Sequence, residues 1–199
     1  MLLAAPRSVW LAAPRSVWLA ASRSVWLAAP RSVWLAAALA GVFAFGVAGS
    51  DAAAKVRSGD RAAKLSGVKD KRGKRVRVKA YRGKWLVMTF GASWCKPCSK
   101  ELPALEKLAK KMAGQKLAFL AVNIDKSIAT GKKFAKRSGL HKVRVGYDPA
   151  GNSVDTYDPP TMPTTYIIGP RGVVRYMHKG YRSGDDKKLK KKLLKFMSK

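Results

Sequence analysis

An almost unbroken apolar run, Trp85 to Phe90, leads directly into the two cysteines of the chain, Cys95 and Cys98. A short apolar run without polar alternation is typical of a strand that is buried on both faces of a sheet. After the cysteines, apolar residues recur at helical spacing until Gly114, a typical helix stop. The sequence therefore predicts a central strand, a C-x-x-C motif at its end, and a helix that begins at the motif.

Strands and helices continue to alternate after this helix. Two further strands are predicted at 116–125 and 142–148, with a short helix between them at 130–139. Two β-rich runs within 164–180 surround a Gly-Pro-Arg-Gly turn, which predicts a hairpin. A last helix is predicted from about Gly184 to Met197. This order of elements predicts an α/β sandwich.

The residues before the central strand are predicted to contribute little to the core. Residues 55–72 are polar and contain glycine, so we expect an exposed lead-in. Residues 75–81 alternate between basic and other side chains, which favours one more strand.

The octapeptide LAAPRSVW recurs, with one substitution, four times within residues 1–34. Every copy contains an arginine and three contain a proline, so the copies cannot join into one apolar membrane helix. We interpret residues 1–34 as low-complexity sequence. Whether the repeats are translated or functional stays open.

Residues 31–54 have the composition of an export signal. Arg31 precedes an uncharged, largely apolar segment that ends in small residues, which suits cleavage before Asp51 or Lys55. The uncharged length also approaches the roughly 18–20 residues that span a bilayer. We therefore expect a signal peptide or a membrane anchor, and favour cleavage. Residues 55–199 form the predicted domain.

The chain is strongly basic, with 41 Lys and Arg residues against 11 Asp and Glu residues and a formal charge of +30. Only four of the basic residues lie in the repeats, so the excess belongs to the domain. Such a charge suits an anionic membrane or cell-wall surface as a neighbour. It also leaves open a second class of function, a basic binding module for anionic envelope polymers or nucleic acid. Because the basic residues are spread over every segment and no nucleic-acid motif occurs, we favour an enzyme and expect no specific nucleic-acid partner.

The cysteine pair could be a structural disulfide, half of a metal site or a redox pair. Three positions apart, the cysteines would close a very small loop, which constrains the unfolded chain little. A metal site needs about four ligands, and only His141, His178 and scattered acids remain. A redox pair is favoured. No metal is expected, and no cofactor other than the redox-active disulfide itself.

The strand-to-helix junction predicts different roles for the two sulfurs. Cys95 lies at the helix start, where unpaired N–H groups favour its thiolate, so it is the predicted nucleophile. Cys98 lies one turn deeper and can resolve the mixed disulfide. Lys96 adds positive charge, Pro97 fixes the turn, and Trp94 is expected to pack beside the pair and shield it.

Three stretches, FGASWCKPCSKELPALEKL, FLAVNID and MPTTYIIGPRGVV, resemble the thioredoxin-like fold. They resemble in particular the TlpA/ResA-type exported disulfide reductases, over residues 60–199. The resemblance implies a central mixed β-sheet flanked by helices, with an N-terminal β-hairpin extension. It also implies that Pro163 is a cis-proline opposite the active site and that the backbone of Met162 pairs with a bound substrate strand.

The resemblance further implies a role for Glu101. TlpA/ResA-type proteins have an acid three residues after the second cysteine, and Glu101 occupies that position. Thioredoxin itself has a buried aspartate six residues before the first cysteine, where this chain has Thr89. We predict that Glu101 relays the proton of Cys98. The alternative is a first-turn residue that is favoured only by the helix dipole.

As a whole, the resemblance implies an exported bacterial thiol-disulfide oxidoreductase, a protein-disulfide reductase. Its expected place is the periplasm or the outer face of the cytoplasmic membrane, where it would act as a monomer. The implied partners are disulfide-containing client proteins and a membrane thiol-reductant donor. Candidate clients include apocytochrome c, as in cytochrome c biogenesis, a copper-site protein and misoxidised envelope proteins. The sequence leaves the direction of electron flow and the client open.

Overall fold

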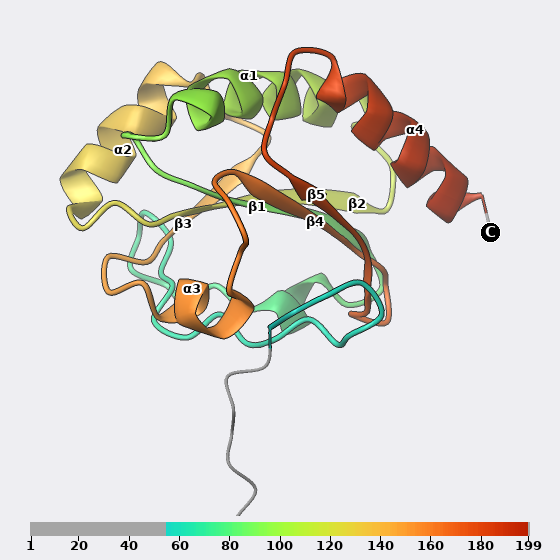
Figure 1. The fold of residues 1–199 in the computed structure, drawn as a ribbon, viewed down its shortest axis with the longest axis horizontal. Coiled ribbons are helices and arrows are strands. Elements are labelled where there is room, and N and C mark those ends of the chain that lie inside the picture. Colours follow the sequence, from blue (N-terminus) through green and yellow to red (C-terminus); the bar gives the residue numbers. More distant parts are fainter. Residues whose placement is uncertain (1–54, 199) are drawn as a thin grey trace, which may run out of the picture. The chain divides into compact units, whose positions relative to one another are not determined.

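The computed structural model describes residues 55–198, so the predicted repeat and export segments lie outside the described residues. Its centre is a five-stranded mixed sheet in the order β3-β2-β1-β4-β5 (Figure 1). The strands are β1 (Trp85–Gly91), β2 (Leu117–Asn123), β3 (Arg144–Tyr147), β4 (Thr164–Ile168) and β5 (Val174–Lys179). β1, β2 and β3 run parallel, whereas β4 is antiparallel to both β1 and β5. The predicted central strand, its neighbours and the hairpin are confirmed.

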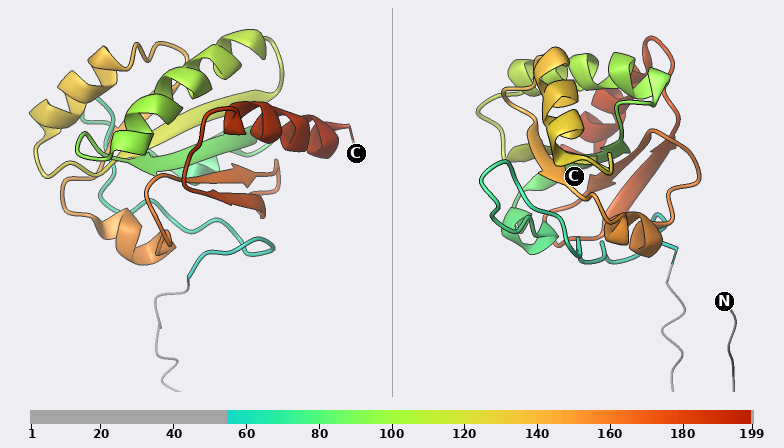
Figure 2. Two further views of the ribbon diagram at one scale, coloured as in Figure 1. Left: turned by 45° about the horizontal axis from the view of Figure 1, so that its top comes forward. Right: turned by 90° about the vertical axis from the view of Figure 1, so that its left-hand side faces the viewer.

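Helices cover one face of the sheet, and irregular segments with two short helices cover the other (Figures 1 and 2). The first face carries α1 (Lys96–Lys111), α2 (Ile128–Arg137) and α4 (Asp185–Met197). The second carries the 3-10 helix η1 (Val78–Tyr81) and α3 (Asn152–Tyr157), which the sequence pattern did not reveal. In residues 55–198, no helix combines the length and the apolar character needed to cross a bilayer.

Burial on both faces explains why β1 is the central strand. Its residues are buried from Leu86 to Gly91. Leu86, Met88 and Phe90 face a cluster with η1, α3 and the N-terminal segment, while Val87 faces a cluster with α1 and α4. An unbroken apolar run suits this position because each successive side chain enters one of two cores.

The expected strand at 75–81 does not form, and the N-terminal β-hairpin extension that the resemblance implied is reduced to one antiparallel bridge, Lys69–Arg75. Residues Val78–Tyr81 form one turn of 3-10 helix, and only isolated bridges occur before β1 in the described chain. The cause is a tight reversal: the Asp70 carboxylate accepts the N–H groups of Arg72 and Lys74, and the chain turns at Gly73 with φ 80°. A single Lys69–Arg75 bridge follows, and no ladder develops.

The exposed lead-in expected at 55–72 is also only partly correct. Val56, Leu65 and Val68 are buried and belong to the core on the second face of the sheet. These apolar residues are separated by polar ones without a regular period, so periodicity could not identify them. They close a face of the sheet that no long helix covers in the described chain.

Gly146 in β3 gives a direct test of this N-terminal packing. A Cβ at this position would lie 2.6 Å from Cγ1 of the fully buried Val68. We expect Gly146→Ala to lower the free energy of unfolding by about 1–3 kcal/mol, because the crowded side chain cannot move into solvent. Urea unfolding measures the change. Adding Val68→Ala should make the double variant more stable than the sum of the single effects predicts; strict additivity would refute the contact.

Candidate redox site

The redox pair lies where β1 ends and α1 begins. Cys95 is the N-cap of α1, and Pro97 occupies the first turn, where its missing N–H is not needed. Gly91 ends β1 directly against the pair, because a Cβ on Gly91 would lie 3.2 Å from Sγ of Cys98. The predicted junction of strand, motif and helix is therefore confirmed.

Cys95 and Cys98 form a disulfide in this structure. Sγ of Cys95 accepts the N–H of Cys98 at 3.3 Å, so the first sulfur caps the helix with a backbone donor. Cys95 is 5% exposed, whereas Cys98 is fully buried. A helix N-terminus stabilises negative charge on a sulfur in this position. The pair is thus asymmetric, because Cys95 caps the helix and retains slight exposure, whereas Cys98 has none.

The loop before the cysteines is held by a carboxylate that the sequence analysis did not single out. Asp125, just after β2, accepts the N–H of Ser93 at 3.0 and 3.1 Å and its hydroxyl at 2.7 Å. Nδ2 of Asn123 donates to the same carboxylate at 2.7 Å. Its position in the sequence could have identified Asp125. β1 and β2 are parallel, so polar residues that follow their carboxyl ends lie at the same edge of the sheet.

Trp94 does not shield the pair as expected. Its side chain is 67% exposed, because Trp94 is a central residue of the turn that the Cys95 N–H closes on the Ala92 carbonyl at 3.1 Å. Lys96 and Pro97 are also exposed. The three residues therefore form the outer surface around Cys95.

A second loop comes from the start of β4. The Met162–Pro163 peptide bond is cis, as the resemblance implied. The Pro163 carbonyl accepts the N–H of Gly180 at 2.7 Å, which links this loop to the end of β5. Met162 packs against the cluster that contains both cysteines. A cleft of about 560 Å³ runs from Pro97 and Met162 to the loop between β5 and α4.

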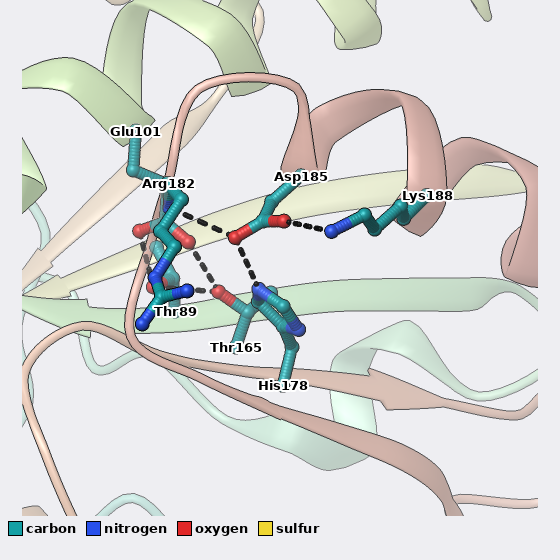
Figure 3. Close-up of polar contacts among 7 residues, drawn as sticks. All are labelled: Thr89, Glu101, Thr165, His178, Arg182, Asp185 and Lys188. Carbon is teal, nitrogen blue, oxygen red and sulfur yellow. Dashed lines mark hydrogen bonds and ion pairs between the residues drawn. The ribbon is translucent and has the colours of Figure 1, made fainter.

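Glu101 lies on α1 three residues after Cys98 and points into the sheet (Figure 3). It is 2% exposed. One carboxylate oxygen accepts the Thr89 hydroxyl at 2.9 Å and the other accepts the Thr165 hydroxyl. The two threonines are directly paired between β1 and β4. The carboxylate of Glu101, on α1, thus accepts a hydrogen bond from Thr89 of β1. Thr89 occupies the position at which thioredoxin has its buried aspartate.

The surroundings of Glu101 raise its pKa, so the side chain stays protonated up to nearly neutral pH. Burial is the largest cause and raises the pKa of Glu101 to about 7, against the opposing hydrogen bonds of Thr165 and Thr89. The negative charge of Asp185 raises the pKa further. A buried carboxyl group with such a pKa can exchange a proton at physiological pH. Within residues 55–198, no hydrogen bond joins Glu101 to Cys98 in this disulfide form.

Asp185 belongs to a polar cluster that sequence reasoning missed (Figure 3). Its carboxylate lies 3.1 Å from Nε2 of His178, and it accepts the backbone N–H of Arg182 at 2.8 Å and the Lys188 ammonium at 3.0 Å. Burial alone would raise the pKa of Asp185, but these three partners lower it to about 2. Asp185 also lies in the first turn of α4, where the helix dipole favours a carboxylate. The register that sets His178 opposite Thr165 brings its cluster beside Glu101.

No group of three or more His, Cys, Asp and Glu side chains in residues 55–198 is arranged to hold a metal ion. His178 pairs with Asp185, and the backbone N–H of His141 donates to Glu106 at 3.0 Å.

Comparisons with known proteins agree with this geometry. The sequence model described as "AhpC/TSA family" matches residues 59–177. The thiol-disulfide oxidoreductase ResA of Bacillus thuringiensis subsp. konkukian is 33% identical over 113 residues, which are 57% of this chain and 65% of that protein. The chain thus spans slightly less than two thirds of the length of that relative.

Two further proteins with thioredoxin-like or thiol:disulfide interchange descriptions are also similar to this chain. The thioredoxin-like protein YneN of Bacillus subtilis is 36% identical over 128 residues, 63% of this chain and 73% of that protein. A crystal structure of a Chlorobium tepidum protein, described as a putative thiol:disulfide interchange protein DsbE, superimposes with a TM-score of 0.65. It is 28% identical and covers 70% of this chain and 96% of that chain. The thioredoxin-like fold and the ResA-type resemblance are confirmed.

The raised pKa of Glu101 predicts a distinctive pH dependence of stability. The folded protein keeps this proton up to about pH 7, whereas an ordinary glutamate loses it near 4.5. The contribution of protonated Glu101 to the free energy of unfolding is therefore complete below about pH 4.5 and is lost as the pH rises through 7. Relative to Glu101→Gln, the wild type should lose on the order of 3 kcal/mol of unfolding free energy across this range. Urea unfolding of the oxidised proteins measures it.

Glu106→Gln is the matched control, because Glu106 is buried on the same helix. Burial acts to raise its pKa, but three backbone N–H groups and Lys110 outweigh burial and lower the pKa of Glu106. The contribution of Glu106 to the free energy of unfolding should therefore be present at neutral pH and be lost as the pH falls. This pH dependence is opposite in sign to that of Glu101. Equal pH profiles for the two variants would contradict the assigned environments.

Proposed function

The chain belongs to the AhpC/TSA family, and we propose that it is an exported thiol-disulfide oxidoreductase that reduces disulfides of client proteins. The observation that carries the proposal is the Cys95–Cys98 disulfide at the N-terminus of α1, with one sulfur capping the helix and the other buried. A disulfide used only as a structural link has no need of a helix N-terminus at one of its sulfurs.

The reaction has two exchange steps. In the reduced enzyme, the Cys95 thiolate attacks one sulfur of a client disulfide, and the other client sulfur leaves as a thiolate. Cys98 then attacks Sγ of Cys95, which releases the second client sulfur and restores the disulfide seen in this structure. Two electrons pass from the enzyme to the client. A thiol donor at the membrane must return them for another turnover.

The helix N-terminus favours the first step because it lowers the free energy of the Cys95 thiolate relative to the thiol. The second step is harder, because Cys98 is fully buried and its thiolate lacks water. Glu101 is the buried carboxyl group nearest in sequence and lies one helical turn further along α1. We assign Glu101 as the group that accepts the proton of Cys98, directly or through one water. The hydroxyls of Thr89 and Thr165 orient its carboxylate.

The client would approach the exposed side of the pair. Pro97 and Met162 border the cleft beside it, and the Met162 backbone precedes the cis bond to Pro163. An extended client segment in this cleft would place its disulfide next to Cys95. This assignment gives Trp94 a role as a contact surface, since its ring is exposed beside the motif.

Export is supported by residues 31–54, whose basic start, apolar centre and small residues fit a signal peptide or an anchor. An oxidising compartment such as the periplasm, or the outer face of the cytoplasmic membrane, would supply disulfides as substrates. We place the enzyme there as a monomer, with a membrane thiol-reductant as its donor. Apocytochrome c, a copper-site protein and misoxidised envelope proteins are the clients to test.

Two cysteine variants test the assigned order of attack. Cys98→Ser should accumulate a mixed disulfide between Cys95 and a model client such as insulin, whereas Cys95→Ser should form none. In the reduced wild type, pH-dependent alkylation should show Cys95 reacting with an apparent pKa well below about 8.5. Mass spectrometry locates the label. Faster labelling of Cys98, or trapping by Cys95→Ser, would reverse the assigned roles.

Replacement of Glu101 should affect one step only. Glu101→Gln keeps the size and hydrogen bonding of the side chain but removes its basicity. Attack by Cys95 should be nearly unchanged, while resolution by Cys98 should slow by about 10²–10⁴-fold, as is typical for a lost acid-base group. Stopped-flow reduction of a model disulfide across pH separates the steps. Glu106→Gln is the control; an unchanged resolution rate in Glu101→Gln would leave bulk water as the acceptor.

A further inference from the structure

A second cleft is lined by residues of α2, β3 and the segment 70–74 and by neither cysteine. Its strand, β3, lies at one edge of the sheet (Figure 1). It encloses about 850 Å³, and none of its lining residues belongs to the redox site. One wall is α2, the other is the reversal at residues 70–74, and β3 forms the floor. The bridge between Lys69 and Tyr147 joins the reversal to β3, so this wall is fixed to the floor of the cleft.

The cleft brings together cationic side chains from three separate segments of the chain. Lys132 and Lys136 lie one turn apart on α2, so they share one face of the helix. The complete set of Lys and Arg residues in the lining is Lys71, Arg72, Lys74, Lys132, Lys136 and Arg144. His141 also borders the cleft. The sequence shows these residues as part of an even spread of charge, but the fold gathers them around one space.

Acidic side chains near the cleft already have partners. Asp70 is the one acid in the lining, and its carboxylate accepts the N–H groups of Arg72 and Lys74 and lies 3.5 Å from Arg144. Glu106, behind the His141 segment, accepts three backbone N–H groups. One carboxylate therefore faces six cations. Their mutual repulsion is relieved when an anion enters.

We propose that this cleft binds a linear polyanion built of repeating phosphate groups. Lysine and arginine are donors only, and a phosphate chain presents acceptors only, so each of the six cationic side chains in the lining can donate to it. An acidic peptide would also bring backbone N–H donors, for which these walls provide few acceptors. A flat membrane could touch only the rims of a two-walled cleft. The site would hold the enzyme on phosphate-containing polymers, and it does not depend on the proposed redox reaction.

The test must separate this site from the net charge of the chain. Lys71→Gln/Lys132→Gln/Lys136→Gln removes three exposed cleft cations that form no ion pair within residues 55–198. The matched control is Lys187→Gln/Lys191→Gln/Lys195→Gln, three exposed lysines on one face of α4. Both full-chain variants lose the same charge. Binding of labelled linear inorganic polyphosphate is followed by fluorescence anisotropy at several salt concentrations.

We expect the cleft variant to lose more than about tenfold in affinity, and its log–log salt slope to fall by about 2, as three lost contacts to a flexible chain predict. The α4 control should lose less than about threefold. Lys132→Arg/Lys136→Arg should keep wild-type affinity. Insulin reduction by each variant confirms that the fold is intact, because none of these residues touches the redox site.

Three outcomes would overturn the proposal. Equal losses in the cleft and α4 variants would mean that net charge alone attracts polyphosphate. Tighter binding of polyglutamate than of polyphosphate of equal length would assign the cleft to acidic peptides. A cleft variant that keeps polyphosphate affinity but loses binding to vesicles containing phosphatidylglycerol would assign it to a membrane surface.

Discussion

The turn from β1 into α1 is the constraint on which the rest of the molecule depends. β1 is buried between two cores, so its carboxyl end is fixed in space, and α1 starts there with Cys95 as its cap. The helix must therefore present its unpaired N–H groups to the first sulfur and bury the second one against Gly91. The chemical difference between two identical side chains follows from this geometry.

A buried carboxyl group is the second consequence of the same packing. Because α1 lies flat on the sheet, Glu101 cannot reach solvent, and it is tolerated only because paired threonines from β1 and β4 donate to it. The His178–Asp185 cluster adds a fixed negative charge nearby. The acid thus depends on three elements, α1, the sheet and the start of α4, that are far apart in sequence.

The fold also determines where the positive charge of the domain is concentrated. Read along the chain, basic residues occur in every segment and point to no particular surface. In the folded chain, the N-terminal reversal packs beside β3 and faces α2, which concentrates six cations around one cleft. The redox pair and this cleft lie on different elements, so a surface contact and disulfide chemistry need not compete for the same residues.

The sequence by itself determined the α/β order, the central strand and the redox motif at a helix start, because apolar periodicity and residue spacing are local properties. Glu101 was identified through the family resemblance. Tertiary structure decided the rest. Periodicity could not show that Val56, Leu65 and Val68 complete a core, that residues 75–81 turn instead of pairing, or that Trp94 faces solvent. It also could not bring Thr165 and Asp185 to Glu101, or lysines of two segments to one cleft. These contacts join residues distant in the chain, and their energies depend on burial and distance, which exist only after the sheet has formed.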